Sequence, residues 1–294
     1  QAVSVSPSHT VSFSARRGTG WFPGEYGSLW FSTNAFLSAA PRSLAGLIVL
    51  PEMEWTVNSL TVTNGSIGFM DGFRATVNND VLISGANAEL IVGGHRRAFT
   101  EFRCGGNLVL TNSAKCHLFS APTNGLATTY GALLAVDGRF QVSTGSWVFP
   151  VSSTNDGGTP LVEVGYLTVA SNAGFNAAGL GWESTWAGTG QGIGPGVGGD
   201  RGSGGGHGGR GGKSSSGNAG GQSYDSTNAP IQPGSGAGAR AGGSQGSGGG
   251  RGGGAIRVIA RETVRLEGTM NADGLRSWVF DSGGGAGGSI FVIC

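Results

Sequence analysis

Seven acidic side chains could support catalysis if the fold brought two of them together. Hydrolysis of a glycan needs paired carboxylates roughly 5–10 Å apart, and a lyase needs a calcium-binding acidic cluster with a basic proton acceptor. The acids are Asp71, Asp80, Glu89, Asp137, Asp156, Glu163 and Glu183. Asp71 with Arg74, or His95 with Arg96 and Arg97, could line one face. Most of the acids fall in expected turns at unrelated positions of the strand pattern, so we expect no catalytic residue.

Parts of the sequence look like glycine-rich motifs that bind phosphate, calcium or RNA, but none of them matches such a motif fully. Residues 208–214 read GGRGGKS, but a phosphate-binding loop needs glycine where His207 stands and a buried strand before it. A calcium-binding glycine repeat needs regularly spaced aspartates, and Asp200 and Asp225 are isolated. Arg-Gly-Gly occurs in only two copies, whereas RNA-binding segments repeat it among aromatics. We therefore predict no cofactor, no metal and no nucleic-acid partner.

The three cysteines are Cys104, Cys116 and Cys294. Cys104 and Cys116 could pair across adjacent strands, and such a disulfide would require an oxidising compartment. Cys294 is then free or bonded to another chain. No Cys-x-x-Cys pair or ordered histidine accompanies them, which argues against zinc.

Aromatic side chains provide the candidates for ligand binding. Between residues 21 and 36 they are denser than elsewhere, either because they plug the open end of a core or because they form a binding surface. The candidates for stacking on sugar rings are Trp21, Trp30, Trp182 and Trp186. Asn64 begins Asn-Gly-Ser, which is a glycosylation acceptor in a eukaryote or a plain turn.

Charge is scarce in this chain. Of 294 residues only 12% are charged, and the formal net charge of +1 gives no strong argument for nucleic acid, an acidic membrane surface or a polyanion. No apolar run approaches the length of about 20 residues that spans a membrane. Gln1 without an initiator methionine is compatible with a mature secreted chain or with a fragment. This composition favours an extracellular structural protein.

Short apolar strands recur between turn residues from residue 43 to residue 178. Corresponding strands begin at Leu60, Leu82, Leu108 and Leu133, so the repeat is roughly 20 to 30 residues long, the length of one coil of a β-solenoid. No helical period persists. We expect an all-β fold of stacked parallel strands, with a β-sandwich as the competing architecture because its strands have similar spacing.

Residues 187–254 hold about half of the 60 glycines. The tract is either a flexible insertion or a segment whose bare backbone packs closely on a neighbouring surface, which we favour. The expected organisation is an alternating strand with an aromatic cap (1–42), coils (43–186), the glycine-rich insertion (187–254) and terminal coils (255–294).

The chain resembles glycine-rich β-helix proteins of cell surfaces. The resemblance rests on the glycine runs that lead into Ile256 and Ile290, on the unit of residues 264–274 that ends Asn-Ala-Asp-Gly, and on the Leu-x-Val coils. It is specific over residues 245–294, weaker over 55–180 and absent over 1–40. It implies a right-handed parallel β-helix in an extracellular, adhesin-like or appendage protein, and it supplies no catalytic residues.

We therefore expect a subunit of a surface fibre or filament that assembles through the ends of the solenoid. The apolar strand at the end of the chain offers an edge to which another chain can add a strand. The residues expected at such a junction are Val3, Val5, Val11, Phe13, Ile290, Val292 and Cys294. The alternatives are a glycan-binding adhesin and a β-helix polysaccharide lyase or hydrolase.

Overall fold

The computed structural model describes residues 13–16, 26–37, 44–63, 65–94, 97–185, 187–240, 248–277 and 280–294. Within these ranges the fold is all-β, apart from the 3-10 helix η1 (Asn34–Phe36). Several residues singled out above lie outside the described part of the chain: Val3, Val5, Val11, Trp21, Asn64, His95, Arg96 and Trp186.

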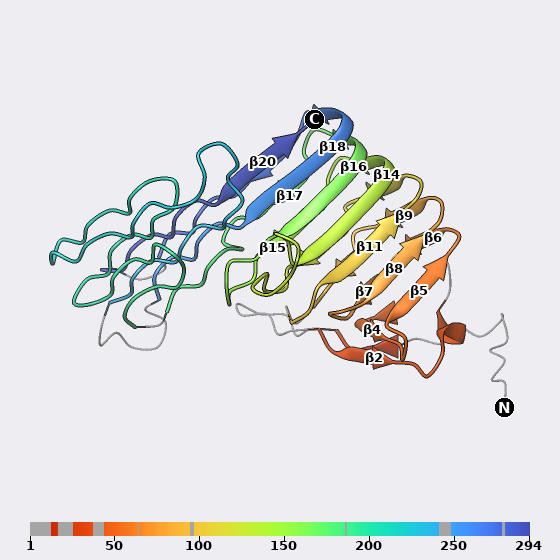
Figure 1. Cartoon of the computed structure of the whole chain (residues 1–294), viewed down its shortest axis with the longest axis horizontal. Helices are drawn as coiled ribbons and strands as arrows, with labels where there is room; N and C mark the ends of the chain where they lie inside the picture. Colours follow the sequence, from red (N-terminus) through yellow and green to blue (C-terminus); the bar gives the residue numbers. More distant parts are fainter. Residues whose placement is uncertain are drawn as a thin grey trace.

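Two large sheets hold most of the strands (Figure 1). The eight-stranded sheet has the order β19 (Thr269–Asn271), β17 (Gly174–Asn176), β15 (Trp147–Val151), β13 (Lys115–Phe119), β10 (Glu89–Val92), β7 (Ser66–Phe69), β4 (Leu47–Val49) and β2 (Ser28–Trp30). The ten-stranded sheet contains β20 (Ser289–Ile293), β18 (Ala255–Leu266), β16 (Pro160–Val169), β14 (Ala132–Val142), β11 (Thr100–Cys104), β8 (Arg74–Val77) and β5 (Glu54–Val57), with β12 (Leu108–Thr111), β9 (Val81–Ser84) and β6 (Leu60–Thr63) beside them. β1 (Phe13–Ser14) pairs with β3 (Leu44–Ala45).

Every pairing between these strands is parallel. The chain alternates between the sheets, with one strand in the eight-stranded sheet followed by one or two in the ten-stranded sheet. Each strand then pairs with its counterpart in the next passage: β7 with β10, β10 with β13 and β13 with β15. Figure 1 shows the result as a stack that rises from β2 and β5 to β20. Parallel partners need crossover connections rather than hairpins, so the antiparallel sandwich considered above is wrong.

The long strand β14 pairs with two shorter strands of the preceding passage, and its register is irregular between the two paired parts. β14 pairs with β11 up to Val136 and with β12 from Phe140 onward, and its register against β16 shifts between Val136 and Arg139. Gly138 lies in this irregularity, where a Cβ atom would be 2.7 Å from the carbonyl oxygen of Gly106. A bulge bends a strand, and here it requires glycine because the turn between β11 and β12 is too close for a side chain.

The core lies between the sheets and is filled by alternate residues of the strands. Leu60 and Val62 are buried in β6 while Thr61 and Thr63 point outward, which is the period of two read from the sequence. Phenylalanine rings contact one another within the core, with 5.8 Å between the centroids of the tilted rings of Phe69 and Phe102.

Aromatic residues cover the first passages of the chain. Phe13 meets Phe31 edge to face at 5.1 Å between ring centroids, and both pack on the same core as Leu29 and Leu37. Tyr26 is buried in a second cluster. For Phe31 the core-plugging interpretation of the aromatic region is therefore correct. Tyr26 instead packs with Leu47 and Ile91 on the other face of the eight-stranded sheet, and Trp30 is 64% exposed.

The glycine tract forms a bundle of extended segments beside the last strands (Figure 1). We call residues 187–240, 248–254 and 280–288 the glycine bundle. Its backbone hydrogen bonds recur every third residue: the amides of Gly234 and Ala237 donate to Gly253 and Gly250 of one neighbouring segment. Other donor pairs with this spacing are Gly236 and Ala239, Gly202 and Gly205, Gly250 and Gly253, and Gly283 and Ala286.

A spacing of three is the period of the polyproline II helix, in which successive amides point roughly 120° apart. A β-strand, with a period of two, reaches neighbours on two sides only. Residues 233–239 are buried at the centre of the glycine bundle and bond to several surrounding segments.

Close approach explains the glycines. A Cβ atom at Gly252 would lie 1.8 Å from the carbonyl oxygen of Gly234, and one at Gly250 would lie 1.9 Å from that of Leu275. Any side chain there would separate the segments. The described part of the tract is thus packed on itself and on the final strands, and it is not a flexible insertion.

Candidate functional site

Three of the acids considered for catalysis, Asp71, Asp80 and Asp156, hold turns together. Asp71 accepts the backbone amides of Gly94 and Arg97, at 2.8 and 2.9 Å. Asp80 accepts the backbone and side-chain nitrogens of Asn107. No three His, Cys, Asp or Glu side chains gather to hold a metal ion within the described ranges.

Asp156 shows the same use most fully. Its carboxylate accepts the backbone amides of Thr123, Asn124 and Gly158 and the hydroxyl of Thr123. Burial disfavours the charged form, but these hydrogen bonds outweigh burial and lower the pKa of Asp156. The carboxylate thus ties the 121–131 loop to the turn at residues 153–158.

A shallow pocket beside β5, β8 and β11 is lined by three glutamates and one arginine. Its volume is about 100 Å³, and its lining residues are Glu52, Met53, Glu54, Gly72, Phe73, Arg74, Phe99 and Glu101. Arg74 lies 3.3 Å from Glu54 and 3.1 Å from Glu101, and Arg103 also pairs with Glu101. Arg74 therefore neutralises two glutamates rather than joining Asp71 as considered above.

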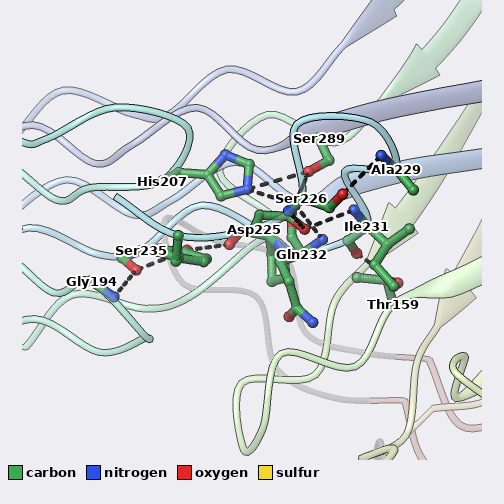
Figure 2. A network of polar contacts seen from close by, with 12 residues as sticks. Thr159, Gly194, His207, Asp225, Ser226, Ala229, Ile231, Gln232, Ser235 and Ser289 are labelled. Atoms are coloured by element: carbon green, nitrogen blue, oxygen red, sulfur yellow. Dashed lines mark hydrogen bonds and ion pairs between the residues drawn. The ribbon is translucent and has the colours of Figure 1, made fainter. Parts of the chain in front are cut away.

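Figure 2 shows a buried cluster of the residue types found in serine hydrolases, His207, Asp225 and Ser289. The His207 Nε2 atom is 3.1 Å from Asp225 Oδ2, and the Ser289 hydroxyl lies 3.0 Å from the same oxygen and 3.3 Å from the same nitrogen. In a catalytic triad the carboxylate and the hydroxyl engage opposite ring nitrogens, and here they share one.

Ser289 is also inaccessible. It is 2% exposed, and the one hydrogen of its hydroxyl is shared between the carbonyl oxygen of Gln232, at 2.7 Å, and Asp225 Oδ2. A nucleophile needs a free path to a substrate carbonyl and a base at hydrogen-bond distance. The cluster instead fastens the start of β20 to two segments of the glycine bundle, and we call it the polar latch.

Asp225 is the centre of the polar latch. It accepts the backbone amides of Ser226, Ile231 and Gln232, which closes the 225–232 loop, and its φ is 78°. Burial opposes ionisation, but the hydrogen bonds from Gln232, Ser226, Ser289 and Ile231 prevail and lower the pKa of Asp225.

A buried arginine adds a second junction beside the polar latch. Arg257 of β18 donates to the carbonyl and the hydroxyl of Thr129 and to the hydroxyl of Thr159, which in turn donates to the carbonyl of Ile231. Burial lowers the pKa of Arg257. The 121–131 loop, β18 and the glycine bundle are thereby joined at one place.

The last strands present an apolar surface. The terminal edge, as we define it, comprises β19, β20 and residues 263–266 of β18. β19 and β20 are the last strands of their sheets, and residues 263–266 pair with β16 and lie beyond the part of β18 that pairs with β20. Ile290 is 44% exposed, Ile293 45% and Leu266 46%. Val292 is partly buried against the core. Ile290 continues the inward-facing position of Ile256, which is 1% exposed.

The other predicted sites have mixed outcomes. Cys104 and Cys116 are free, buried thiols on strands of different sheets, and the Cys104 thiol donates to the carbonyls of Asn79 and Asn107, so the expected disulfide is not formed in this structure. Burial raises the pKa of Cys104 to about 11 and raises that of Cys116 as well. Cys294 is exposed.

Trp182 is 7% exposed and cannot stack on a sugar as predicted, because the glycine bundle covers it.

Sequence reasoning missed the polar latch. Ser289 and His207 are 82 residues apart, and Ser289 and Asp225 are 64 apart, with no motif to connect them. In the sequence, His207 was noted only because it occupies a position where a phosphate-binding loop requires glycine.

None of the helices in the described part of the chain is long and apolar enough to cross a membrane. No protein-family model matches this sequence, and neither a curated protein nor a solved structure shows significant similarity to it.

Proposed function

We propose that this chain is an extracellular structural protein that acts by association through its terminal edge and not by catalysis. In this proposal the two parallel sheets form a right-handed parallel β-helix, and the glycine bundle is a rigid lateral element anchored to it by the polar latch. The alternation of strands between the sheets and the parallel pairing of successive passages support a β-helix.

The observation that carries the proposal is a difference in exposure between two paired, inward-facing residues of β18 and β20. Ile256 is 1% exposed in β18, and its neighbour Ile290 in β20 is 44% exposed. Unpaired backbone groups and exposed apolar side chains on one strand edge favour the addition of another strand. Exposed apolar patches of this kind commonly mark interaction surfaces.

The use of the acids supports a non-catalytic role. Asp71, Asp80 and Asp156 are engaged by backbone amides, and Asp225 lies in the polar latch. A lyase or hydrolase would need carboxylates that converge on an open groove. The extracellular location is proposed from the low charge, 12% of residues, and from the resemblance to surface β-helix proteins.

Sedimentation velocity over a range of concentrations tests the proposal. We expect the wild-type chain to associate as its concentration rises, and Ile290→Asp to remain monomeric because it places a charge in the buried contact. Leu126→Asp is the matched control, since Leu126 is 38% exposed but lies in the 121–131 loop. A monomeric wild type at high concentration, or equal behaviour of the two variants, would refute association through the terminal edge.

Glycan binding is the second candidate, and the 64% exposure of Trp30 favours it. An exposed indole on a strand can stack on a sugar ring. On a glycan array we expect specific hits that Trp30→Ala abolishes and Leu126→Ala preserves. An array without specific hits would refute glycan binding, and the structural role would remain as the proposed function.

A further inference from the structure

The two ends of the strand stack differ. At the first passages the inward-facing residues Trp55, Leu60 and Val62 are 5%, 0% and 0% exposed. Phe13 and Phe31 belong to the apolar residues that pack on this end of the core. At the other end Ile290 and Leu266 are nearly half exposed. Apolar side chains therefore cover the core near β5 and β6, and part of it remains open at the terminal edge.

This difference limits how copies can meet. Head-to-tail association would bring the open terminal edge of one copy against the covered first passages of the next. The apolar residues that cover the core there, Phe13 and Phe31 among them, would then lie between the two cores. Contact between two open edges leaves no such layer between the cores, and it buries exposed apolar residues on both sides.

We propose, on the basis of the proposed function, that the partner of the terminal edge is a second copy of the same edge, related by a two-fold axis. Two copies of β20 related in this way run antiparallel, and an antiparallel strand can extend a parallel sheet. The free edge of one β20 would exchange backbone hydrogen bonds with the free edge of the other. An isologous contact of this kind closes, so the product is a dimer and not an open filament.

Charge on the terminal part of β18 and the turn after it is compatible with self-association. Arg261 pairs with Asp137, Arg265 pairs with Glu267, and Glu262 adds one exposed carboxylate. A surface of one sign would repel its own copy, whereas one whose charges are largely paired does not. The same surface gives little attraction to a strongly charged partner.

Single cysteines along β20 test the symmetry. In a Cys294→Ser background, each of positions 289 to 293 is replaced in turn by cysteine, and the associated protein is oxidised. Around a two-fold axis only the position on or next to the axis meets its own copy within the 4.4–6.8 Å between Cα atoms that a disulfide requires. Moving two residues along the strand adds roughly 13 Å to that separation.

We expect one maximum of covalent dimer within residues 289–293 and none at Leu126→Cys, which serves as the off-site control. Each variant is checked by circular dichroism before oxidation, so that a misfolded variant is recognised. Open filaments without any self-cross-linking position would overturn the two-fold inference while leaving association through the terminal edge intact. A protein that stays monomeric would overturn both.

Discussion

Replacing Gly252 by alanine tests how the glycine bundle is held together. The new Cβ atom would lie 1.8 Å from the carbonyl oxygen of Gly234, whereas ordinary contact begins near 3.4 Å. The two segments must therefore separate by roughly 1.6 Å. Gly212→Ala is the matched control, because Gly212 belongs to the same bundle but a Cβ atom there meets nothing within 4 Å.

The size of the effect follows from the hydrogen bonds at the contact. Gly252 donates to Trp182 at 2.9 Å, Trp182 donates to Gly234 at 3.1 Å, and Gly234 donates to Gly253 at 2.8 Å. The bond from Gly234 to Gly253 joins the separated segments directly, and Trp182 cannot keep its bonds to both segments, so two of the three are lost, each contributing about 1 kcal/mol. We expect a loss of about 2 kcal/mol for Gly252→Ala and a change between zero and a gain of about 1 kcal/mol for Gly212→Ala.

Urea unfolding followed by circular dichroism measures the free energy of unfolding, and hydrogen exchange of residues 233–239 reports on the glycine bundle itself. Gly252→Ala should lower protection there by roughly thirtyfold, as about 2 kcal/mol implies, if these amides exchange by the opening that the substitution favours. Equal exchange in the two variants, or unprotected amides in the wild type, would refute a hydrogen-bonded bundle.

Three further predictions concern the polar latch, the thiols and the junction at Arg257. Because the pKa of Asp225 is lowered in the folded chain, its contribution to stability is present above the unfolded value of about 3.9 and is lost as the pH falls through the folded value. In urea unfolding measured at a series of pH values, Asp225→Asn should remove this loss of stability in acid. The control Asp200→Asn, at an exposed position, should retain it. Alkylation of the native, reduced protein at pH 8 should label Cys294 alone, since Cys104 and Cys116 are buried with raised pKa values, and mass spectrometry should find three labels after unfolding; rapid native labelling of all three would contradict the packing. Arg257→Met should raise proteolysis within residues 121–131 because Thr129 loses its donors, whereas the exposed Arg139→Met should not, and equal cleavage would argue against the junction.

Strand positions were predictable because side-chain alternation determines which residues face the core. Leu60 and Val62, for example, lie inward in β6, with threonines outward. Parallel pairing followed from the repeat length, which is too long for hairpins. The resemblance to surface β-helix proteins and the extracellular location remain predictions.

The glycine bundle could not be derived in the same way. Its bonds join backbone groups, and glycine has no side chain whose polarity would mark an inner or outer face. Gly252 and Gly212 look equivalent in the sequence, yet one faces a carbonyl oxygen at 1.8 Å and the other faces open space. The burial of Trp182 and the polar latch depend on this packing, so neither could be predicted from the sequence.

Hydrogen exchange of β20 as a function of protein concentration tests the central claim most directly. If the terminal edge is the surface through which the protein acts, amides of residues 289–293 should gain protection as the concentration rises, while those of β11 and β14 stay constant. Protection in β20 that does not change between dilute and concentrated protein would contradict the account.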